Sequence, residues 1–242
     1  MIDKIIDAVN DFFSSVTFNP KVFVDNKKEE AYYNEANLQH ELSLYLKQKF
    51  QEKIELRLEY PVNKLLKNDK IILSKKEIDI IIKLNKDQVE VNNEFLIIEL
   101  KFPKYNAGMP LALLHALNDI QFCEQIKESN NSKNIKLHFA TIFLTDNKRK
   151  WTKREHIYKI FKLDKDMTNV QFTLPKEIIF INSIETLRKG VEEIKKRITT
   201  DSGDLDYENW VTDNKDIIKL KSEHEIKWEI IDNKWLYYIC KF

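Results

Sequence analysis

Three ionisable residues interrupt two apolar runs in the first half of the chain. Asp79 lies in the segment KKEIDIIIKL, and Glu99 and Lys101 lie in EFLIIELKF. Both segments predict β-strands, whose successive side chains point to opposite faces, so Glu99 and Lys101 share a face with Ile97. Asp79 likewise shares a face with Ile81. Charged groups persist in such surroundings only when they are paired or bound to a metal, because their desolvation is costly.

Two carboxylates and a neighbouring amine make up a set suited to metal-assisted phosphodiester hydrolysis. Asp79 and Glu99 offer the oxygen ligands that Mg²⁺ prefers, and Mn²⁺ is expected to substitute for it. The bound ion would lower the pKa of a water ligand and neutralise charge on the scissile phosphate. Lys101 is placed either to orient that water or to stabilise the developing negative charge.

A fourth acidic residue is expected on a helix over residues 29–52. On a helical projection, Glu35 falls in the middle of the apolar stripe that Leu38, Leu42 and Leu46 form. Glu35 therefore points toward the sheet, where it either ligates the metal directly or holds a metal-bound water. An acid and a lysine two positions apart on a strand are common by chance. The helical acid and the aspartate on the preceding strand favour a functional site.

Residues of about 30–145 resemble the PD-(D/E)XK, or restriction-endonuclease-like, nuclease superfamily, including uncharacterised bacterial proteins of that kind. The resemblance rests on the segments NEANLQHEL, KKEID and IELKFP, followed by a helix and a strand. It implies a Mg²⁺-dependent nuclease, with Asp79, Glu99 and Lys101 in the catalytic motif and Glu35 as the helical acid. Ile78 stands where the name-giving proline would be, which weakens the specificity of the motif but not its chemistry.

The helix predicted over 110–128 offers two supporting polar residues. Gln121 and Glu124 lie on the same side of its projection as Leu113 and Leu117. The resemblance implies that a polar residue of this helix approaches the site. The alternative for both side chains is a surface cap or a hydrogen bond within the core.

Two further segments are candidates for contact with substrate. Lys104 and Tyr105 follow the catalytic lysine directly in the loop FPKYNAGMP. In DNKRKWTKR, Lys148, Arg149 and Trp151 combine basic groups with an aromatic ring, which suits phosphate contacts and stacking. The alternative for both segments is a solvated surface, especially in a chain so rich in lysine.

The order of predicted elements indicates an α/β fold with a mixed central β-sheet flanked by helices, a restriction-endonuclease-like core. Helices over 1–14, 29–52 and 110–128 combine with strands over 54–62, 75–84, 94–101 and 135–145. Residues 146–242 are expected to form an α+β elaboration of the same single domain. It comprises strands at HIYKIFKL and KEIIFI, a helix at SIETLRKGVEEIKKRI and a terminal hairpin turning at Asp232-Asn233.

Composition limits the possible functions without selecting one. The 242 residues are 43% hydrophobic and carry a net charge of +1, so any contact with nucleic acid would be a local feature. No secretory or membrane-spanning segment is apparent, and we expect a soluble cytoplasmic protein that does not bind membranes. Cys123 and Cys240 match no metal or redox spacing and are expected to be buried thiols. No nucleotide-binding glycine-rich loop is present.

The leading hypothesis is a DNA endonuclease of the restriction or phage-defence type. A homodimer would fit double-strand cleavage, because a two-fold axis addresses both strands. Within the nuclease class, DNA repair, junction resolution or RNA cleavage is a further possibility. A different class is a catalytically silent nucleic-acid-binding or protein-interaction module that keeps the fold.

Overall fold

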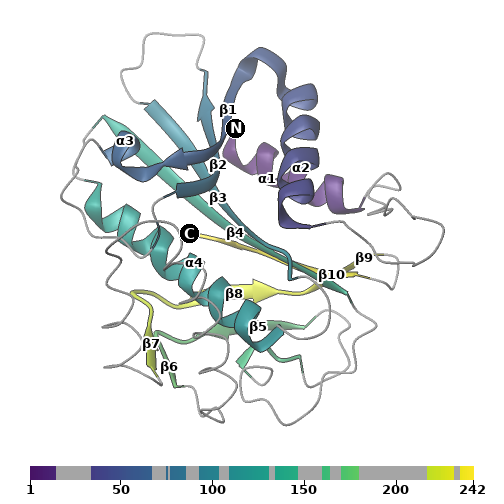
Figure 1. The fold of residues 1–242 in the computed structure, drawn as a ribbon, viewed down its shortest axis with the longest axis vertical. Helices are drawn as coiled ribbons and strands as arrows, with labels where there is room; N and C mark the ends of the chain where they lie inside the picture. The colour runs from purple at the N-terminus through teal and green to yellow at the C-terminus, as the bar shows by residue number, and fades with distance from the viewer. Residues whose placement is uncertain are drawn as a thin grey trace, which may run out of the picture.

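A six-stranded mixed sheet forms the centre of the molecule (Figure 1). The computed structural model describes residues 1–14, 34–66, 75, 77–85, 93–103, 109–130, 134–146, 160–163, 170–179, 217–231 and 235–242. The strand order is β1-β2-β3-β4-β10-β9, with bounds Ile54–Pro61, Glu77–Leu84, Asn93–Lys101, Ile135–Asp146, Trp235–Lys241 and Glu229–Ile231 in that order. β3 and β4 run parallel and the other neighbouring pairs antiparallel, which confirms the predicted α/β class with a mixed sheet flanked by helices.

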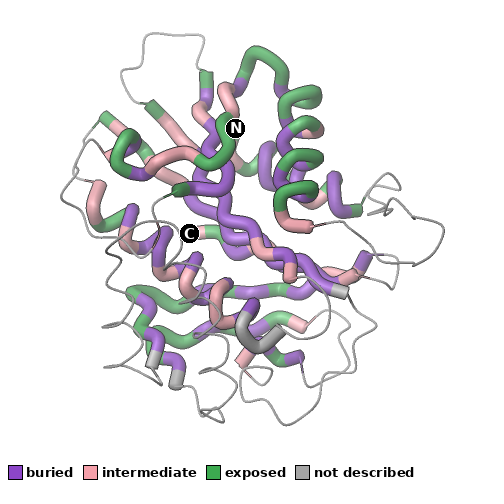
Figure 2. Tube along the Cα trace, viewed as in Figure 1, coloured by how far each residue is buried: buried purple, intermediate pink, exposed green. Residues whose placement is uncertain are grey.

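The two faces of the sheet are covered by different helices. Helices α1 (Ile2–Ser14) and α2 (Glu35–Phe50) pack on one face, against a cluster that includes Ile80, Ile98 and Leu100. Helix α4 (Met109–Ser129) packs on the other, where Ile81 and Ile97 join Phe122 and Ile126 in a second cluster. Figure 2 shows the buried middle of the strands between these layers. The predicted alternation therefore places Asp79, Glu99 and Lys101 on the α4 side.

Helix α2 begins at Glu35 and not at residue 29. Asn34, the residue before the helix, has an extended backbone. Its side-chain oxygen accepts a hydrogen bond from the backbone N–H of Asn37, and the side-chain oxygen of Asn37 accepts one from the backbone N–H of Asn34. This reciprocal cap satisfies two backbone donors that the first turn leaves open, and so fixes where the helix begins. The sequence interpretation overlooked it because the usual glutamate or glutamine at the third helical position is replaced by asparagine.

The two ends of the chain complete the sheet. Phe13 of α1 stacks on Tyr237 of β10 with 4.7 Å between ring centroids. The predicted terminal hairpin is confirmed by the antiparallel pairing of β9 with β10, while its turn at Asp232-Asn233 lies outside the described residues. The sheet and its helical cover thus extend beyond the core expected at about 30–145.

The remaining described elements are short. The strand predicted at HIYKIFKL is wrong where it is described, since residues 160–163 form a turn with a left-handed φ of 54° at Lys162, and this turn buries Phe161 and Leu163. The carbonyl of Phe161 accepts from the indole of Trp228 at 2.9 Å, which takes the place of a strand partner. Two-stranded sheets pair β5 (Gln171–Leu174) with β8 (His224–Lys227) and β6 (Glu177–Ile179) with β7 (Ile217–Lys219). A short helix, α3 (Val62–Leu66), follows β1 directly, and the helix predicted at 183–198 lies outside the described residues.

Helix α4 is tied to this C-terminal part through two polar side chains. Glu124 is buried and accepts from the backbone N–H of Lys221 at 2.8 Å, the backbone N–H of Ser222 at 3.0 Å and Nε2 of His224 at 2.9 Å. Burial alone raises the pKa of Glu124, but these bonds together lower it below its ordinary value. Gln121 donates to the carbonyl of Lys219 at 3.0 Å. Both side chains thus hydrogen-bond residues 219–224, and among the described residues neither forms a hydrogen bond to a catalytic candidate.

None of the helices in the described residues is long and apolar enough to cross a membrane. Among these same residues, both cysteines are buried free thiols, as the sequence predicts. The five histidines include His224, whose bond to Glu124 is structural.

Replacing Glu124 with alanine is expected to destabilise the fold strongly. The change leaves buried donors without an acceptor, so we expect the free energy of unfolding to fall by about 2–4 kcal/mol in urea titration. Glu128 lies one turn later on α4 and forms an exposed ion pair with Lys221 at 3.4 Å, which makes E128A a matched control that should change stability by less than about 0.5 kcal/mol. Equal losses in the two variants would show that Glu124 does not secure the C-terminal part.

Candidate active site

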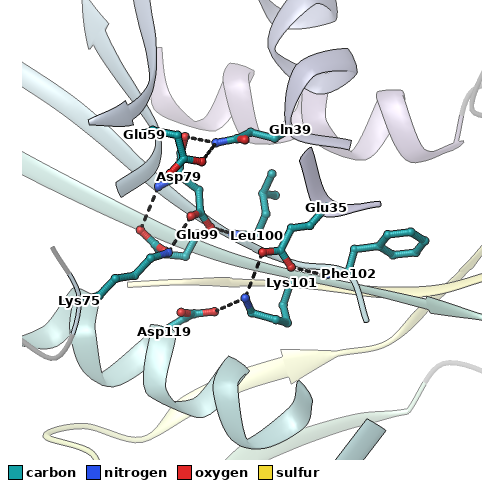
Figure 3. Close-up of polar contacts among 10 residues, drawn as sticks. All are labelled: Glu35, Gln39, Glu59, Lys75, Asp79, Glu99, Leu100, Lys101, Phe102 and Asp119. Carbon is teal, nitrogen blue, oxygen red and sulfur yellow. Dashed lines mark hydrogen bonds and ion pairs between the residues drawn. The ribbon is translucent and has the colours of Figure 1, made fainter. Parts of the chain in front are cut away.

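The structure brings the four predicted catalytic residues into one cluster between α2 and α4 (Figure 3). Asp79 and Glu99 are buried and lie on either side of an ammonium group that the sequence interpretation did not include. Lys75 Nζ lies 2.6 Å from Asp79 Oδ1 and 2.5 Å from Glu99 Oε2. One oxygen of each carboxylate therefore converges on a single cation.

The second oxygen of each carboxylate is fixed by backbone. Pairing between β2 and β3 runs as far as Ile80 opposite Ile98, beyond which the two strands separate. There the N–H of Leu100 donates to Asp79 Oδ2 at 2.7 Å, and the N–H of Asp79 donates to Glu99 Oε1 at 3.4 Å. The side chains satisfy backbone donors that the ladder releases, and this orients both carboxylates.

The carbonyl of Asp79 is held from the opposite layer. Gln39 of α2 is buried, and its Nε2 donates to the Asp79 carbonyl at 2.5 Å and to Glu59 Oε1 at 2.8 Å. Glu59 lies in β1 between the positions paired with Ile78 and Ile80, and has a left-handed φ of 47°. A non-glycine residue in that region is strained, and such strain is common beside functional sites. Gln39 follows Glu35 by one helical turn, and that spacing was the available signal for it.

Lys101 lies between two further carboxylates. Its Nζ is 3.2 Å from Glu35 Oε1 and 3.8 Å from Asp119 Oδ2. Glu35 Oε2 also accepts from the N–H of Phe102 at 2.8 Å, and its place in the first turn of α2 favours a negative charge. Glu35 is thus bound to Lys101 and the end of β3 in this arrangement. Among the described residues, no three side chains of the histidine, cysteine, aspartate or glutamate type are grouped to hold a metal ion.

Asp119 is the acidic residue that α4 contributes to the site. The sequence interpretation chose Gln121 and Glu124 because they lie near the stripe of Leu113 and Leu117, from which Asp119 is turned by about 120° at 100° per residue. The stripe of Leu113 and Leu117 packs mainly on the C-terminal part of the chain. A second side of α4, which includes Phe122 and Cys123, packs on β2 and β3. A helix buried on two sides gives no single stripe from which to choose.

At full ionisation the cluster would carry more negative than positive charge. Four carboxyl groups (Glu35, Asp79, Glu99 and Asp119) face two ammonium groups (Lys75 and Lys101), so full ionisation leaves a net charge of −4 + 2 = −2. Burial, reinforced by Asp79, raises the pKa of Glu99 well above its ordinary value. Burial likewise raises the pKa of Asp119 to about 7, against the opposing effect of Lys101 and Lys75. The excess charge is of the size that one divalent cation would balance.

Both lysines remain protonated at neutral pH. Burial alone lowers the pKa of Lys75, but Glu99, Asp79 and Asp119 together raise it above its ordinary value. The pKa of Lys101 is raised in the same way, with burial opposed by Asp119, Glu35 and Asp79. Burial and the charge of Lys101 lower the pKa of His115 on α4 to about 4, so this imidazole is neutral at pH 7. The site thus combines ammonium groups that stay protonated with carboxyl groups whose ionised form is disfavoured by burial.

The residues predicted to contact substrate lie outside the described residues. They are Lys104, Tyr105, Lys148, Arg149 and Trp151. The described residues stop at Pro103, shortly after β3, and at Asp146, the last residue of β4. Contact of these five side chains with substrate stays a prediction.

Comparisons of the chain with profiles of protein families, with curated protein sequences and with solved structures find no match. No relative therefore assigns a role to a residue of this cluster. Its chemistry follows from the carboxyl and ammonium groups and from the hydrogen bonds that hold them.

Replacing Asp119 with asparagine is expected to stabilise the metal-free protein at alkaline pH. Because its pKa is raised to about 7, the folded protein holds this proton more tightly than the unfolded chain does. The contribution of protonated Asp119 to the free energy of unfolding is fully present below about pH 4 and is lost as the pH rises through about 7. D119N cannot lose that proton, so its melting temperature in EDTA should exceed that of the wild type by at least about 2 °C at pH 8 and by little at pH 4.

The matched control is Asp3→Asn at the surface. Asp3 pairs with Lys241 at 3.7 Å and is 88% exposed, so its effect on melting should be small and similar at the two pH values. A D119N protein that melts below the wild type at pH 8 would contradict the expectation, because the ion pair with Lys101 would then outweigh the cost of burial.

Proposed function

We propose that this chain is a Mg²⁺-dependent nuclease of the PD-(D/E)XK type that cleaves DNA, with a role in restriction or phage defence. One observation carries the proposal. Asp79 Oδ1 and Glu99 Oε2 converge on a single cation, at 2.6 and 2.5 Å, while the backbone fixes their other oxygens. An arrangement in which carboxylates from two strands are oriented before any ligand arrives supports a cation-dependent site.

The residues present fit a divalent cation. Mg²⁺ is usually held by one or two carboxylates, with waters and substrate phosphate as its other ligands, so Asp79 and Glu99 are a sufficient protein contribution. The charge of −2 that full ionisation would give the cluster also suits a divalent ion. When bound, the ion would supply a water of lowered pKa and neutralise charge on the scissile phosphate. Glu35 takes no direct part in holding it in this proposal, since its oxygens are bound to Lys101 and Phe102.

In this proposal the ammonium of Lys101 supplies positive charge and hydrogen-bond donors and does not act as a base. Asp119, Glu35 and Asp79 keep it protonated by raising its pKa. Glu35 and Asp119 hold the ammonium from two sides, which reduces the reorganisation needed when negative charge develops on the phosphate. Glu35 and Asp119 are positioning residues for Lys101. Gln39 has the same role for Asp79, because it fixes the carbonyl of that residue.

A second candidate function has a specific observation in its favour. Lys75 already pairs with both Asp79 and Glu99, and a site closed in this way is compatible with a nucleic-acid-binding or protein-interaction module that does not cut. Such a module would not need a divalent ion. Repair, junction or RNA nucleases stay within the first proposal and differ in substrate. Cleavage of both strands would favour a homodimer with two sites about a two-fold axis.

Replacing Asp79 with asparagine is expected to abolish cleavage. Plasmid and phage DNA, single-stranded DNA, branched DNA and RNA are incubated with the protein and Mg²⁺, and products are separated on gels. We expect D79N to lose at least about a hundredfold in rate, the scale reached when one preorganised electrostatic group is removed. EDTA should stop the wild-type reaction.

Glu77→Gln is the matched control for this assay. Glu77 is exposed on the same strand, two residues before Asp79, so E77Q removes one carboxylate nearby without touching the cluster. We expect E77Q to cleave like the wild type. Product that forms equally with D79N, or no product from the wild type on any of these substrates, would overturn the proposed nuclease function.

A further inference from the structure

Lys75 occupies the point where the two carboxylates converge. Its Nζ is 2.6 Å from Asp79 Oδ1 and 2.5 Å from Glu99 Oε2, close to the distances of about 2.0–2.1 Å for Mg²⁺ and about 2.3–2.6 Å for Ca²⁺ at which oxygen ligands hold these ions. An ammonium group and a metal ion cannot both occupy the position between these two oxygens, because they would overlap in volume and repel each other. The ammonium and a divalent ion therefore exclude one another.

The place of Lys75 in the chain allows it to leave. Strand β2 begins at Glu77, and Lys75 belongs to no helix or strand. Its side chain is 31% exposed, whereas that of Glu99 is fully buried, so the ammonium approaches the carboxylates from the solvent side. Rotation of this side chain breaks no strand pairing. Lys101, by contrast, is paired with Phe143 in β4 and is held between Glu35 and Asp119.

The ammonium compensates the buried carboxylates while no metal is bound. Without it, Asp79 and Glu99 would carry two negative charges that share a buried site, which is strongly unfavourable. Phe122 of α4 lies 6.0 Å from Lys75 Nζ, with the ammonium over its ring. This weak contact adds little to hold the side chain in place.

We propose that Lys75 is an internal cation that occupies the divalent-metal position between Asp79 and Glu99 and is displaced when the metal binds. Lys75 thereby sets the metal concentration at which the site fills. The inference rests on the proposed function, since it takes Asp79 and Glu99 as metal ligands. It assigns to Lys75 a role distinct from that of Lys101, which keeps its partners when the metal enters.

Calorimetric titration with Mn²⁺ alone tests the displacement. We expect Lys75→Met to bind Mn²⁺ at least about tenfold more tightly than the wild type, because the fraction of molecules with an open metal position rises when the competing ammonium is removed. Lys83→Met is the matched control, because Lys83 lies in β2 opposite Phe95 and away from the cluster, and this variant should bind like the wild type. Glu99→Gln should abolish binding, which separates the site from adventitious ions.

Thermal unfolding provides a second readout that does not depend on calorimetry. In EDTA, K75M should melt below the wild type, because two buried carboxylates lose their counterion. Saturating Mn²⁺ should raise the melting temperature of K75M more than that of the wild type, since the metal takes the place of the missing charge. If K75M does not fold, Lys75→Gln serves in both measurements.

The outcomes separate this proposal from the proposed function. If wild-type and K75M proteins bind Mn²⁺ equally, or K75M binds it more weakly, and E99Q does not bind it, the displacement is overturned while the metal site stands. If neither the wild type nor K75M binds Mn²⁺, the metal-dependent function fails and the displacement with it. Tighter binding by K75M that E99Q does not share supports the proposal.

Discussion

The central constraint on this structure is the desolvation of two carboxylates inside an apolar sheet. Asp79 and Glu99 lie among isoleucines and leucines that pack two layers of helices onto β2 and β3. Each carboxylate would cost several kcal/mol if it were left unpaired there. Separation of β2 from β3 at this point exposes two backbone donors, and the carboxylates accept from both. The break in the ladder and the burial of charge therefore stabilise each other.

The surrounding elements can be understood from this constraint. Helix α2 supplies Gln39 to the carbonyl of Asp79 and Glu35 to Lys101, and it is anchored by a cap at Asn34. Helix α4 supplies Asp119 from the other face and is held in turn by its bonds to residues 219–224. The terminal strand β10 and helix α1 enlarge the core on which both helices rest. Packing in the rest of the core thus offsets the desolvation cost of the buried carboxylates.

The sequence allowed much of the site to be predicted but not the parts that depend on tertiary geometry. Strand alternation was enough to place Glu99 and Lys101 on one face of their strand and Asp79 on the face of Ile81 in its own, and a helical projection was enough to direct Glu35 toward the sheet. Asp119 escaped notice because α4 is buried on two sides, so its periodicity does not reveal which side meets the strands. Lys75 was part of the strand predicted over 75–84, but β2 begins only at Glu77, and strand alternation does not indicate that a side chain four positions before Asp79 reaches its carboxylate.

The position of the cation between β2 and β3 is the claim on which the account depends most. Crystals of the wild-type protein soaked in Mn²⁺ and measured at the manganese absorption edge locate the ion directly. We expect one anomalous peak bonded to Asp79 Oδ1 and Glu99 Oε2, with the ammonium of Lys75 moved away from both oxygens. A peak elsewhere, or none at saturating Mn²⁺ with Lys75 still between the two carboxylates, would contradict it.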